Sequence, residues 1–396
     1  MSLIDKLILP KSWICYLNSK IDKDFVSNKE KEYIKDYILN NKYSFIAKQI
    51  VDNNYSFSIP KKHIISKRNT SKKRIVYTFN EDEMMILKMI SYLLYDYDNL
   101  FSPNLYSFRK QAGVKNAVTN LIKIKNLSNM YGYKVDIQNY FNSIDTDILL
   151  HNLKKDIKDK KLFNILFEIL SNKKVEYNDL IIEESKGVMA GIPISAFLAN
   201  YYLKEIDEYF WKEKIVYIRY ADDIIMFCNN KEELDKAKLH LENKLNEYKL
   251  SINKSKEYYI NPNEKFDFLG FSINGKEIDL GKNTLNKIKG KIRRSARGIR
   301  RWMIKNNAKS VYALKAMNRK YNRKFFGNDL HNELSWKYWF FPSITTTKSL
   351  KIIDTYMQEN LRYIVTGKHN KKNYEIVPYS LLKECNYRSL VNEYYK

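Results

Sequence analysis

The pattern of apolar and polar residues divides the first part of the chain into helices and a strand. Residues 1–60 carry apolar side chains three or four positions apart among charged ones, which is the spacing of amphipathic helices. The stretch Ile-Val-Tyr-Thr-Phe at 75–79 predicts a strand, and the polar residues before it predict a turn. Residues 81–97 predict a helix with an acidic first turn, which suits a helix N-terminus.

Between residues 131 and 275 short strands and helices follow one another. Strand patterns occur at 131–137 and on both sides of an Ala-Asp-Asp sequence in 216–228. Helix patterns occupy 192–211 and 231–250, and two more short strands are expected near 255–260 and 266–273. This order indicates an antiparallel sheet backed by helices, so we expect an α+β layer.

The chain changes character after residue 280. Residues 282–328 contain sixteen Lys or Arg and no Asp or Glu, with apolar residues at roughly helical intervals. A solvated helix face is the plain interpretation, but the complete lack of acids favours phosphate binding. We therefore expect a basic helical subdomain that begins near 276–282.

Charge and cysteine usage narrow the class of protein. The chain has 396 residues and a formal net charge of +25, which favours polyanionic partners. Its three cysteines are far apart, which excludes a thiolate zinc motif and fits a reducing, cytoplasmic location. The N-terminal sequence does not resemble a signal peptide, and no apolar run is long enough to predict a membrane span.

Two strand ends carry the candidate chemistry. Asp222 and Asp223 lie at the expected hairpin tip, where they could be an ordinary solvated turn or a site for a divalent cation. Asp136 ends the strand pattern at 131–137 and could alternatively cap the following helix. If the two strands are neighbours, the three carboxylates suit two-metal phosphoryl transfer.

Seven segments, in order through residues 60–275, together resemble the reverse transcriptase family. They are KRNTSKKRIV (67–76), SPNLYSFRKQAGVKNAV (102–118), KVDIQNYF (134–141), GVMAGIPISAFLANYYLKEID (187–207), YADD (220–223), LSINKSK (250–256) and FLGF (268–271). The resemblance is to the bacterial branch, with group II intron and retron enzymes. It implies a right-hand polymerase with fingers, an antiparallel-sheet palm and a helical thumb.

The resemblance also assigns residues to roles. It implies two Mg²⁺ ions, with Mn²⁺ as an alternative, bound by Asp136, Ile137, Asp222 and Asp223, of which the three aspartates are catalytic. It places Lys67, Arg74, Phe141, Ala190 and Lys256 around the incoming dNTP, with Phe141 blocking a ribose 2′-hydroxyl. Nucleic-acid contacts are expected from Arg109, Arg293, Arg294, Arg297, Arg300 and Arg301.

One departure from the family pattern lies in the dNTP site. Ala190 stands where these enzymes usually carry glutamine, and Met189 replaces the usual proline. The lost hydrogen bond to the nucleotide would be worth on the order of 1 kcal/mol. This departure suggests altered fidelity or specialised synthesis.

The division implied by the resemblance is 1–130 for N-terminal helices and fingers, with interleaved palm elements, 131–280 for the palm, and 281–396 for the thumb and a C-terminal extension. No maturase, HNH or RNase H segment is apparent, which favours a compact, defence-associated enzyme. The Val-Thr-Gly at 365–367 lies away from the position where retron enzymes carry it. Expected partners are an RNA template, a dedicated noncoding RNA, dNTPs, the DNA product and further copies of the chain.

Two other functions remain open at this stage. An RNA-synthesising or untemplated polymerase is one, although Phe141 would clash with a ribonucleotide. A polymerase-derived RNA-binding scaffold is the other, although the three carboxylates favour catalysis.

Overall fold

The computed structural model describes residues 2–21, 26–66, 73–110, 112–327 and 335–396. Lys67, expected to contact the triphosphate, lies outside these residues. The chain forms two compact units: unit 1 comprises Met1–Ala117 and Asn129–Pro262, and unit 2 comprises Val118–Ser128 and Asn263–Lys396. The three-part division into fingers, palm and thumb stays a prediction.

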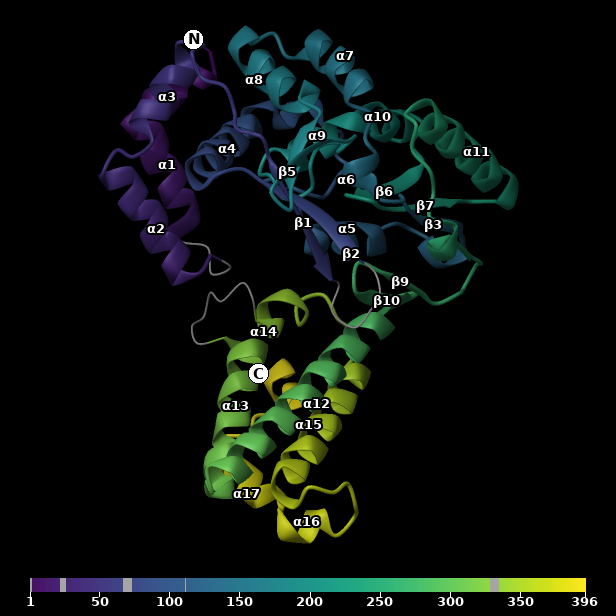
Figure 1. The fold of residues 1–396 in the computed structure, drawn as a ribbon. Coiled ribbons are helices and arrows are strands. Elements are labelled where there is room, and N and C mark those ends of the chain that lie inside the picture. Colours follow the sequence, from purple (N-terminus) through teal and green to yellow (C-terminus); the bar gives the residue numbers. More distant parts are fainter. Residues whose placement is uncertain (1, 22–25, 67–72, 111, 328–334) are drawn as a thin grey trace. The chain divides into compact units, whose positions relative to one another are not determined.

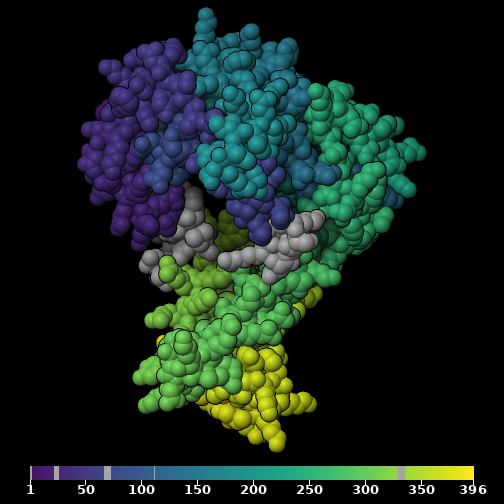
Figure 2. Space-filling model, in the orientation of Figure 1, coloured from purple at the N-terminus to yellow at the C-terminus, as the bar shows by residue number. Residues whose placement is uncertain are grey.

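Unit 1 begins with helices, as their amphipathic spacing predicts. These are η1 (Ile4–Ile8), α1 (Pro10–Ile21), α2 (Asn28–Leu39), α3 (Ser44–Val51) and α4 (Glu81–Leu93), with η2 (Leu94–Leu100) after α4. Asn80 caps α4 by accepting a hydrogen bond from the Glu83 backbone N–H at 2.8 Å. The Ser2 hydroxyl donates to the Asp159 carboxylate at 2.7 Å. In Figure 2 the purple N-terminal residues border teal residues of the same unit.

A small mixed sheet follows in unit 1, with strand order β2-β1-β4-β5. Its strands are β1 (Lys61–Ser66), β2 (Lys73–Thr78), β4 (Lys174–Tyr177) and β5 (Leu180–Glu183). β1 and β2 form an antiparallel hairpin that pairs Ile65 with Arg74. β1 is parallel to β4 through Lys61 and Glu176. Only β2 had been predicted from the sequence.

The palm sheet, defined here as β6-β7-β3-β8, is fully antiparallel. Its strands are β3 (Tyr131–Asp136), β6 (Val216–Tyr220), β7 (Asp223–Cys228) and β8 (Tyr258–Ile260). Helix α11 (Lys231–Glu247) packs on β3 and β7 (Figure 1). It does so through Leu234, Ala237, Leu241 and Leu245, which are buried and spaced three or four residues apart.

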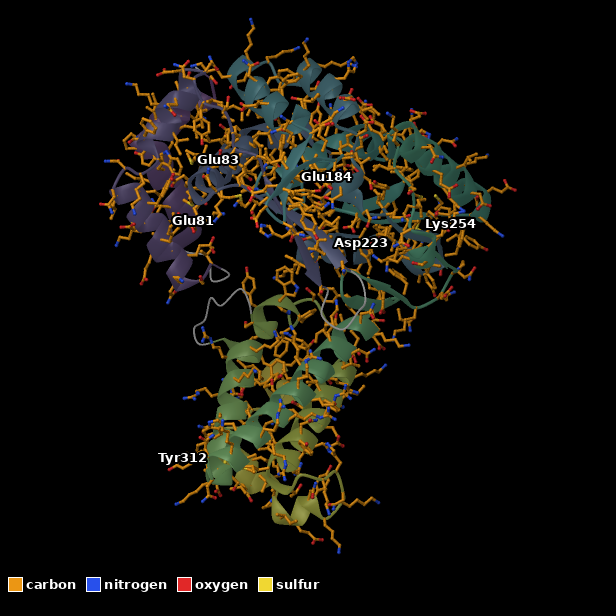
Figure 3. All side chains as sticks on the ribbon, viewed as in Figure 1. Glu81, Glu83, Glu184, Asp223, Lys254 and Tyr312 are labelled. Carbon is orange, nitrogen blue, oxygen red and sulfur yellow. The ribbon has the colours of Figure 1, made fainter. Side chains whose placement is uncertain are left out.

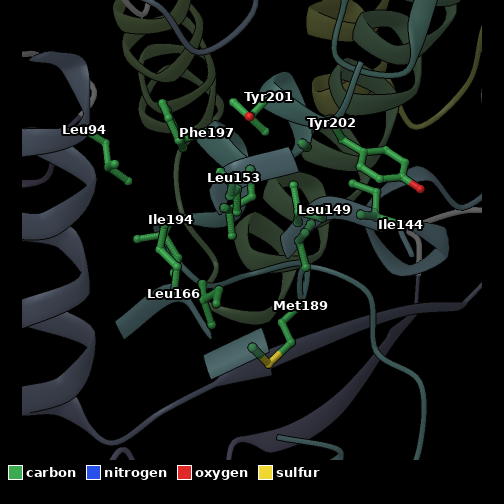
Figure 4. Packing of buried hydrophobic residues seen from close by; sticks show 14 of the residues in the cluster. Leu94, Ile144, Leu149, Leu153, Leu166, Met189, Ile194, Phe197, Tyr201 and Tyr202 are labelled. Atoms are coloured by element: carbon green, nitrogen blue, oxygen red, sulfur yellow. The ribbon is translucent and has the colours of Figure 1, made fainter. Parts of the chain in front are cut away.

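Further helices occupy residues 114–256 of the chain. These are α5 (Val114–Ile122), η3 (Leu127–Asn129), α6 (Tyr140–Ser143), α7 (Thr146–Asp156), α8 (Lys160–Ser171), α9 (Ser195–Tyr202), α10 (Lys204–Lys212) and η4 (Lys254–Lys256). Asp145 caps α7 by accepting hydrogen bonds from the backbone N–H groups of Asp147 and Ile148. Leu149, Leu153, Leu166, Phe197 and Met189 belong to one buried apolar cluster (Figure 4).

Unit 2 contains a three-stranded antiparallel sheet and a group of helices. The sheet has the order β11-β10-β9, formed by β9 (Phe266–Phe268), β10 (Phe271–Asn274) and β11 (Glu277–Leu280). The helices are α12 (Lys282–Lys305), α13 (Ser310–Phe326), α14 (Trp336–Trp339), α15 (Lys348–Thr366), α16 (Asn373–Ile376), α17 (Tyr379–Glu384) and α18 (Leu390–Tyr394). α12 packs against α13 and α15 and buries Ile288, Ile292 and Ala296.

The expected α+β class, with an antiparallel sheet and a helical C-terminal region, is confirmed. The helix expected at 192–211 divides into α9 and α10 at Leu203. Trp336 is buried, whereas Trp339 is 37% exposed. Within the described residues, no helix combines the length and apolar character needed to cross a bilayer.

Candidate active site

The two strand ends that carry the candidate carboxylates are adjacent in the palm sheet. Asp136 is the last residue of β3, and Asp223, which is labelled in Figure 3, is the first residue of β7. The two are direct partners in the antiparallel register. Tyr220 pairs with Asp223 across the β6–β7 hairpin, so Ala221 and Asp222 form a two-residue turn. The register therefore brings together carboxylates that are 86 and 87 residues apart in the sequence.

The turn has an unusual backbone at its first position. Ala221 has φ 56°, and Asp222 is not among the residues with positive φ. This combination is typical of a type II′ hairpin turn, in which the first position usually carries glycine. A left-handed alanine costs about 1–2 kcal/mol, so the surrounding structure must hold this conformation.

The end of β3 is held on both sides by backbone hydrogen bonds. The Ile137 N–H donates to the Asp222 carbonyl at 3.0 Å, and the Asn253 N–H donates to the Asp136 carbonyl at 2.8 Å. The Asp136 side chain contacts the Lys256 ammonium and accepts a long hydrogen bond of 3.4 Å from the Asn253 amide. Asp136 is 5% exposed, so its carboxylate has little freedom to move.

Burial and like charge disfavour the ionised forms of Asp222 and Asp223. The pKa of the Asp222 carboxyl is raised mainly by burial and secondly by the charge of Asp136. Burial, then the charges of Asp222 and Asp136, raises the pKa of Asp223 to about 6. Cations oppose both rises, since Lys256 lies near both groups and Lys134 near Asp223. A divalent cation at this position would relieve the same repulsion far more strongly.

The donor set fits magnesium bound together with a substrate. Within the described residues, no group of three or more His, Cys, Asp or Glu side chains is placed so that it could hold a metal ion. Magnesium does not require one, because it usually takes one or two carboxylates and fills its remaining positions with substrate phosphates and water. Asp136, Asp222 and Asp223 supply such carboxylates. Ile137 has an apolar side chain and could contribute only its backbone carbonyl.

Phe141 and Ala190, both expected in the dNTP site, are joined through one loop. The Val188 N–H donates to the Phe141 carbonyl at 2.9 Å, and the Ala190 N–H donates to the Asn142 side chain at 3.4 Å. A side chain on Gly187 would place its Cβ 2.3 Å from the Phe141 carbonyl oxygen, so this close approach requires glycine. The half-buried Phe141 ring meets Phe108 edge to face, with ring centroids 6.3 Å apart.

The same loop is tied to strand β2. The Tyr77 N–H donates to the Ala190 carbonyl at 2.8 Å, and a Cβ on Gly191 would lie 2.8 Å from the Tyr77 carbonyl oxygen. Arg74 is exposed on this strand, three residues before Tyr77. Hydrogen bonds thus connect the strand of Arg74, the Ala190 loop and the backbone beside Phe141.

The arginines expected to contact nucleic acid fall into two groups. Arg293, Arg294, Arg297 and Arg301 are exposed on α12. Arg300, in contrast, donates to the carbonyls of Ile364 and Val365 at 2.9 and 3.0 Å. These two hydrogen bonds cap the C-terminus of α15. Arg109 donates to both carboxylate oxygens of Asp98 at 3.0 Å and to the Ser102 carbonyl at 2.8 Å. Arg109 thus directs its donors to Asp98 and Ser102 and Arg300 directs its Nη1 to α15, and a nucleic-acid contact of either residue stays a prediction.

Sequence reasoning missed a buried polar network behind the turn. Its members are Asn104, Ser107, Asn200, Asp207 and Arg219, each no more than 5% exposed. Arg219 stands in an apolar strand sequence, where a charged residue is normally taken as solvent-facing. Arg219 directly precedes the YADD motif, and Asp207 ends the motif at 187–207. Neither position shows in the sequence which residue the side chain will contact.

A family model matches more than half of the chain. Residues 59–273 match the model described as reverse transcriptase (RNA-dependent DNA polymerase). This range contains all three candidate carboxylates, both sheets of unit 1 and the loop of Ala190.

Curated proteins match smaller parts of the chain. A putative COX1/OXI3 intron 2 protein of Saccharomyces cerevisiae is 28% identical over 131 residues, covering 33% of this chain and 14% of that protein. The retron Ec83 reverse transcriptase of Escherichia coli is 29% identical over 167 residues, covering 39% of this chain and 52% of that enzyme. The chain thus spans about half, or less, of the length of these relatives. Among solved structures, apo telomerase from Candida tropicalis aligns with a TM-score of 0.49 and 14% identity, over 83% of this chain and 59% of that one.

Proposed function

Because this chain belongs to the reverse transcriptase family, we propose that it is an RNA-directed DNA polymerase that adds dNTPs to a 3′-hydroxyl. The observation that carries the proposal is the register of the palm sheet, in which Asp136 is the direct partner of Asp223, with Asp222 in the adjoining turn. Carboxylates from two neighbouring strands are what two-metal phosphoryl transfer requires.

In the proposed mechanism, Asp136 and Asp222 would hold two Mg²⁺ ions, and Asp223 would orient or complete the site. Bound metal ions would lower the pKa of the primer hydroxyl and stabilise charge on the phosphate being transferred. Arg74 on β2 neutralises part of the triphosphate charge, and Phe141 excludes a 2′-hydroxyl from the sugar position. Lys256, which contacts Asp136, would protonate the leaving pyrophosphate.

RNA is the proposed template and partner. The chain carries a net charge of +25, and α12 presents four exposed arginines without a neighbouring acid in its sequence. The retron reverse transcriptase among the relatives supports the bacterial branch. We further propose that the enzyme works with a dedicated structured noncoding RNA in antiphage defence, as a homo-oligomer. Sequencing the nucleic acid that copurifies with the protein would test this assignment.

The catalytic assignment is tested by primer extension on an RNA template with labelled dNTPs and Mg²⁺. Asp222→Ala combined with Asp223→Ala should lower incorporation by at least about 1,000-fold, since losing metal ligands costs several kcal/mol of transition-state stabilisation. Chelation of Mg²⁺ by EDTA should have the same effect on the wild type. Asp235→Asn, which changes an exposed carboxylate on α11, is the matched control and should retain activity.

The outcomes separate the rival functions. Wild-type rates in the double variant would show that these carboxylates are not catalytic. Incorporation that does not depend on the template would favour an untemplated polymerase, and a preference for rNTPs would favour an RNA polymerase. RNA binding without any synthesis by the wild type would favour an RNA-binding scaffold.

A further inference from the structure

The backbone of Ala221 is held from both ends by buried side chains. The Ala221 N–H donates to the Ser107 hydroxyl at 2.9 Å, and the Ala221 carbonyl accepts from the Arg219 guanidinium at 3.4 Å. Ala221 itself is 8% exposed, so water has little access to either group. Because its φ is left-handed, Ala221 needs such constraints to stay in this conformation.

The Ser107 hydroxyl has one defined orientation. It donates its only proton to the Asn200 side-chain oxygen at 3.1 Å, which leaves a lone pair for the Ala221 N–H. The Asn200 side-chain amide donates in return to the Ser107 carbonyl at 2.8 Å. Ser107 is fully buried, so this reciprocal pair has no competition from solvent. The hydroxyl is therefore a fixed acceptor directed at the turn.

The Arg219 guanidinium is fixed just as firmly. It donates to both Asp207 carboxylate oxygens, at 2.7 and 2.5 Å, and to the Asn200 carbonyl at 3.0 Å. Both side chains are at most 1% exposed. Tyr217 adds a hydrogen bond of 3.0 Å to Asp207. A buried bidentate pair of this kind has one favourable geometry, because any displacement leaves a buried charge without its partner.

We propose that Ser107 is a positioning residue for the metal site, acting through the backbone of Ala221. Its hydroxyl and the Asp207–Arg219 pair lock the turn in the left-handed conformation that presents Asp222 and Asp223 to Asp136. The effect on synthesis rests on the proposed polymerase function. The effect on the turn and on metal binding does not depend on it.

The test compares Ser107→Ala with Ser343→Ala. The first variant removes the acceptor of the Ala221 N–H, and the second removes a buried hydroxyl of unit 2 that has no hydrogen-bond partner among the described residues. Hydrogen exchange of the peptide 217–225 is followed by mass spectrometry in the full-length protein, and Mn²⁺ binding is followed by electron paramagnetic resonance. Ser107→Cys, whose sulfur is only a weak acceptor, gives the same comparison if Ser107→Ala fails to fold.

We expect Ser107→Ala to accelerate exchange of the turn and to weaken Mn²⁺ binding by about 10-fold each, the effect of one lost buried hydrogen bond. In primer extension, kcat should fall by a similar factor while KM for the dNTP stays within about two-fold. Ser343→Ala should change none of these quantities. Wild-type exchange and Mn²⁺ binding in Ser107→Ala would overturn the proposal, whether or not the wild type synthesises DNA. An inactive wild type that binds Mn²⁺ would refute only the polymerase function.

Discussion

At the scale of single residues, Phe141 decides which sugar can enter, according to the proposed function. Its backbone is fixed by the Gly187–Val188 loop and its ring rests against Phe108, so it cannot easily turn aside. Phe141→Ala should open space for a 2′-hydroxyl and raise the ratio of kcat/KM for a matched rNTP over its dNTP by about 10- to 100-fold. Steady-state kinetics with both nucleotides on one template measure the ratio.

Phe108→Ala is the informative companion to that variant. It removes the ring that supports Phe141 without touching the gate itself, so a smaller increase in rNTP use is expected. An unchanged ratio in Phe141→Ala would show that the ring is a packing residue and that sugar choice has another source.

At the scale of elements, α12 is the proposed RNA-binding helix. Reversing Arg293, Arg294, Arg297 and Arg301 to Glu should weaken RNA binding, because fewer counterions are released from the phosphates. The slope of log K against log[salt] should become shallower by about 0.7–0.9 for each lost phosphate contact. A filter-binding salt titration measures both quantities. Arg300 is left unchanged, since it caps α15 and its loss would disturb the fold.

A second charge reversal distinguishes RNA binding by the α12 surface from a general effect of the protein's net charge. Lys11, Lys29, Lys35 and Lys48 are exposed on the N-terminal helices, and changing them to Glu alters the net charge by the same eight units. This control variant should keep most of the wild-type slope of log K against log[salt]. Equal losses in both variants would mean that RNA responds to overall charge and not to α12.

At the scale of the whole molecule, a buried lysine makes stability depend on pH. Burial lowers the pKa of Lys186 from 10.5 to about 8, and its ammonium donates to the Lys174 carbonyl at 3.0 Å. Between these pH values the unfolded chain binds more protons than the folded one, so the contribution of Lys186 to stability rises as pH increases. The free-energy cost of burying the charged Lys186 ammonium is fully present below pH 8 and is gone above pH 10.5.

Lys186→Met should therefore stabilise the protein at pH 7, by about 1–2 kcal/mol after the lost hydrogen bond to Lys174 is counted. The gain should shrink between pH 8 and 10.5. Urea denaturation of wild type and variant at several pH values gives the difference directly, and groups common to both cancel. A constant difference across that range would show that Lys186 is not the titrating group.

Local sequence determined much of this protein, because strand and helix patterns depend on neighbouring residues. The palm strands, α11 and the basic helices appear where the spacing predicts them, and the three carboxylates are recognisable at a strand end and at a hairpin tip. Family membership follows from the same ordered motifs. Such features rely on periodicity and turn chemistry, which a single segment contains.

Only the tertiary structure decided which of these segments meet. The register of Asp136 with Asp223, the inward turn of Arg109 and Arg300, and the Ser107–Ala221 hydrogen bond all join distant parts of the chain. The sequence does not distinguish a strand arginine that faces solvent from one that faces a buried carboxylate. Its role depends on the desolvation and hydrogen bonding of its final position, and these arise only when the chain packs.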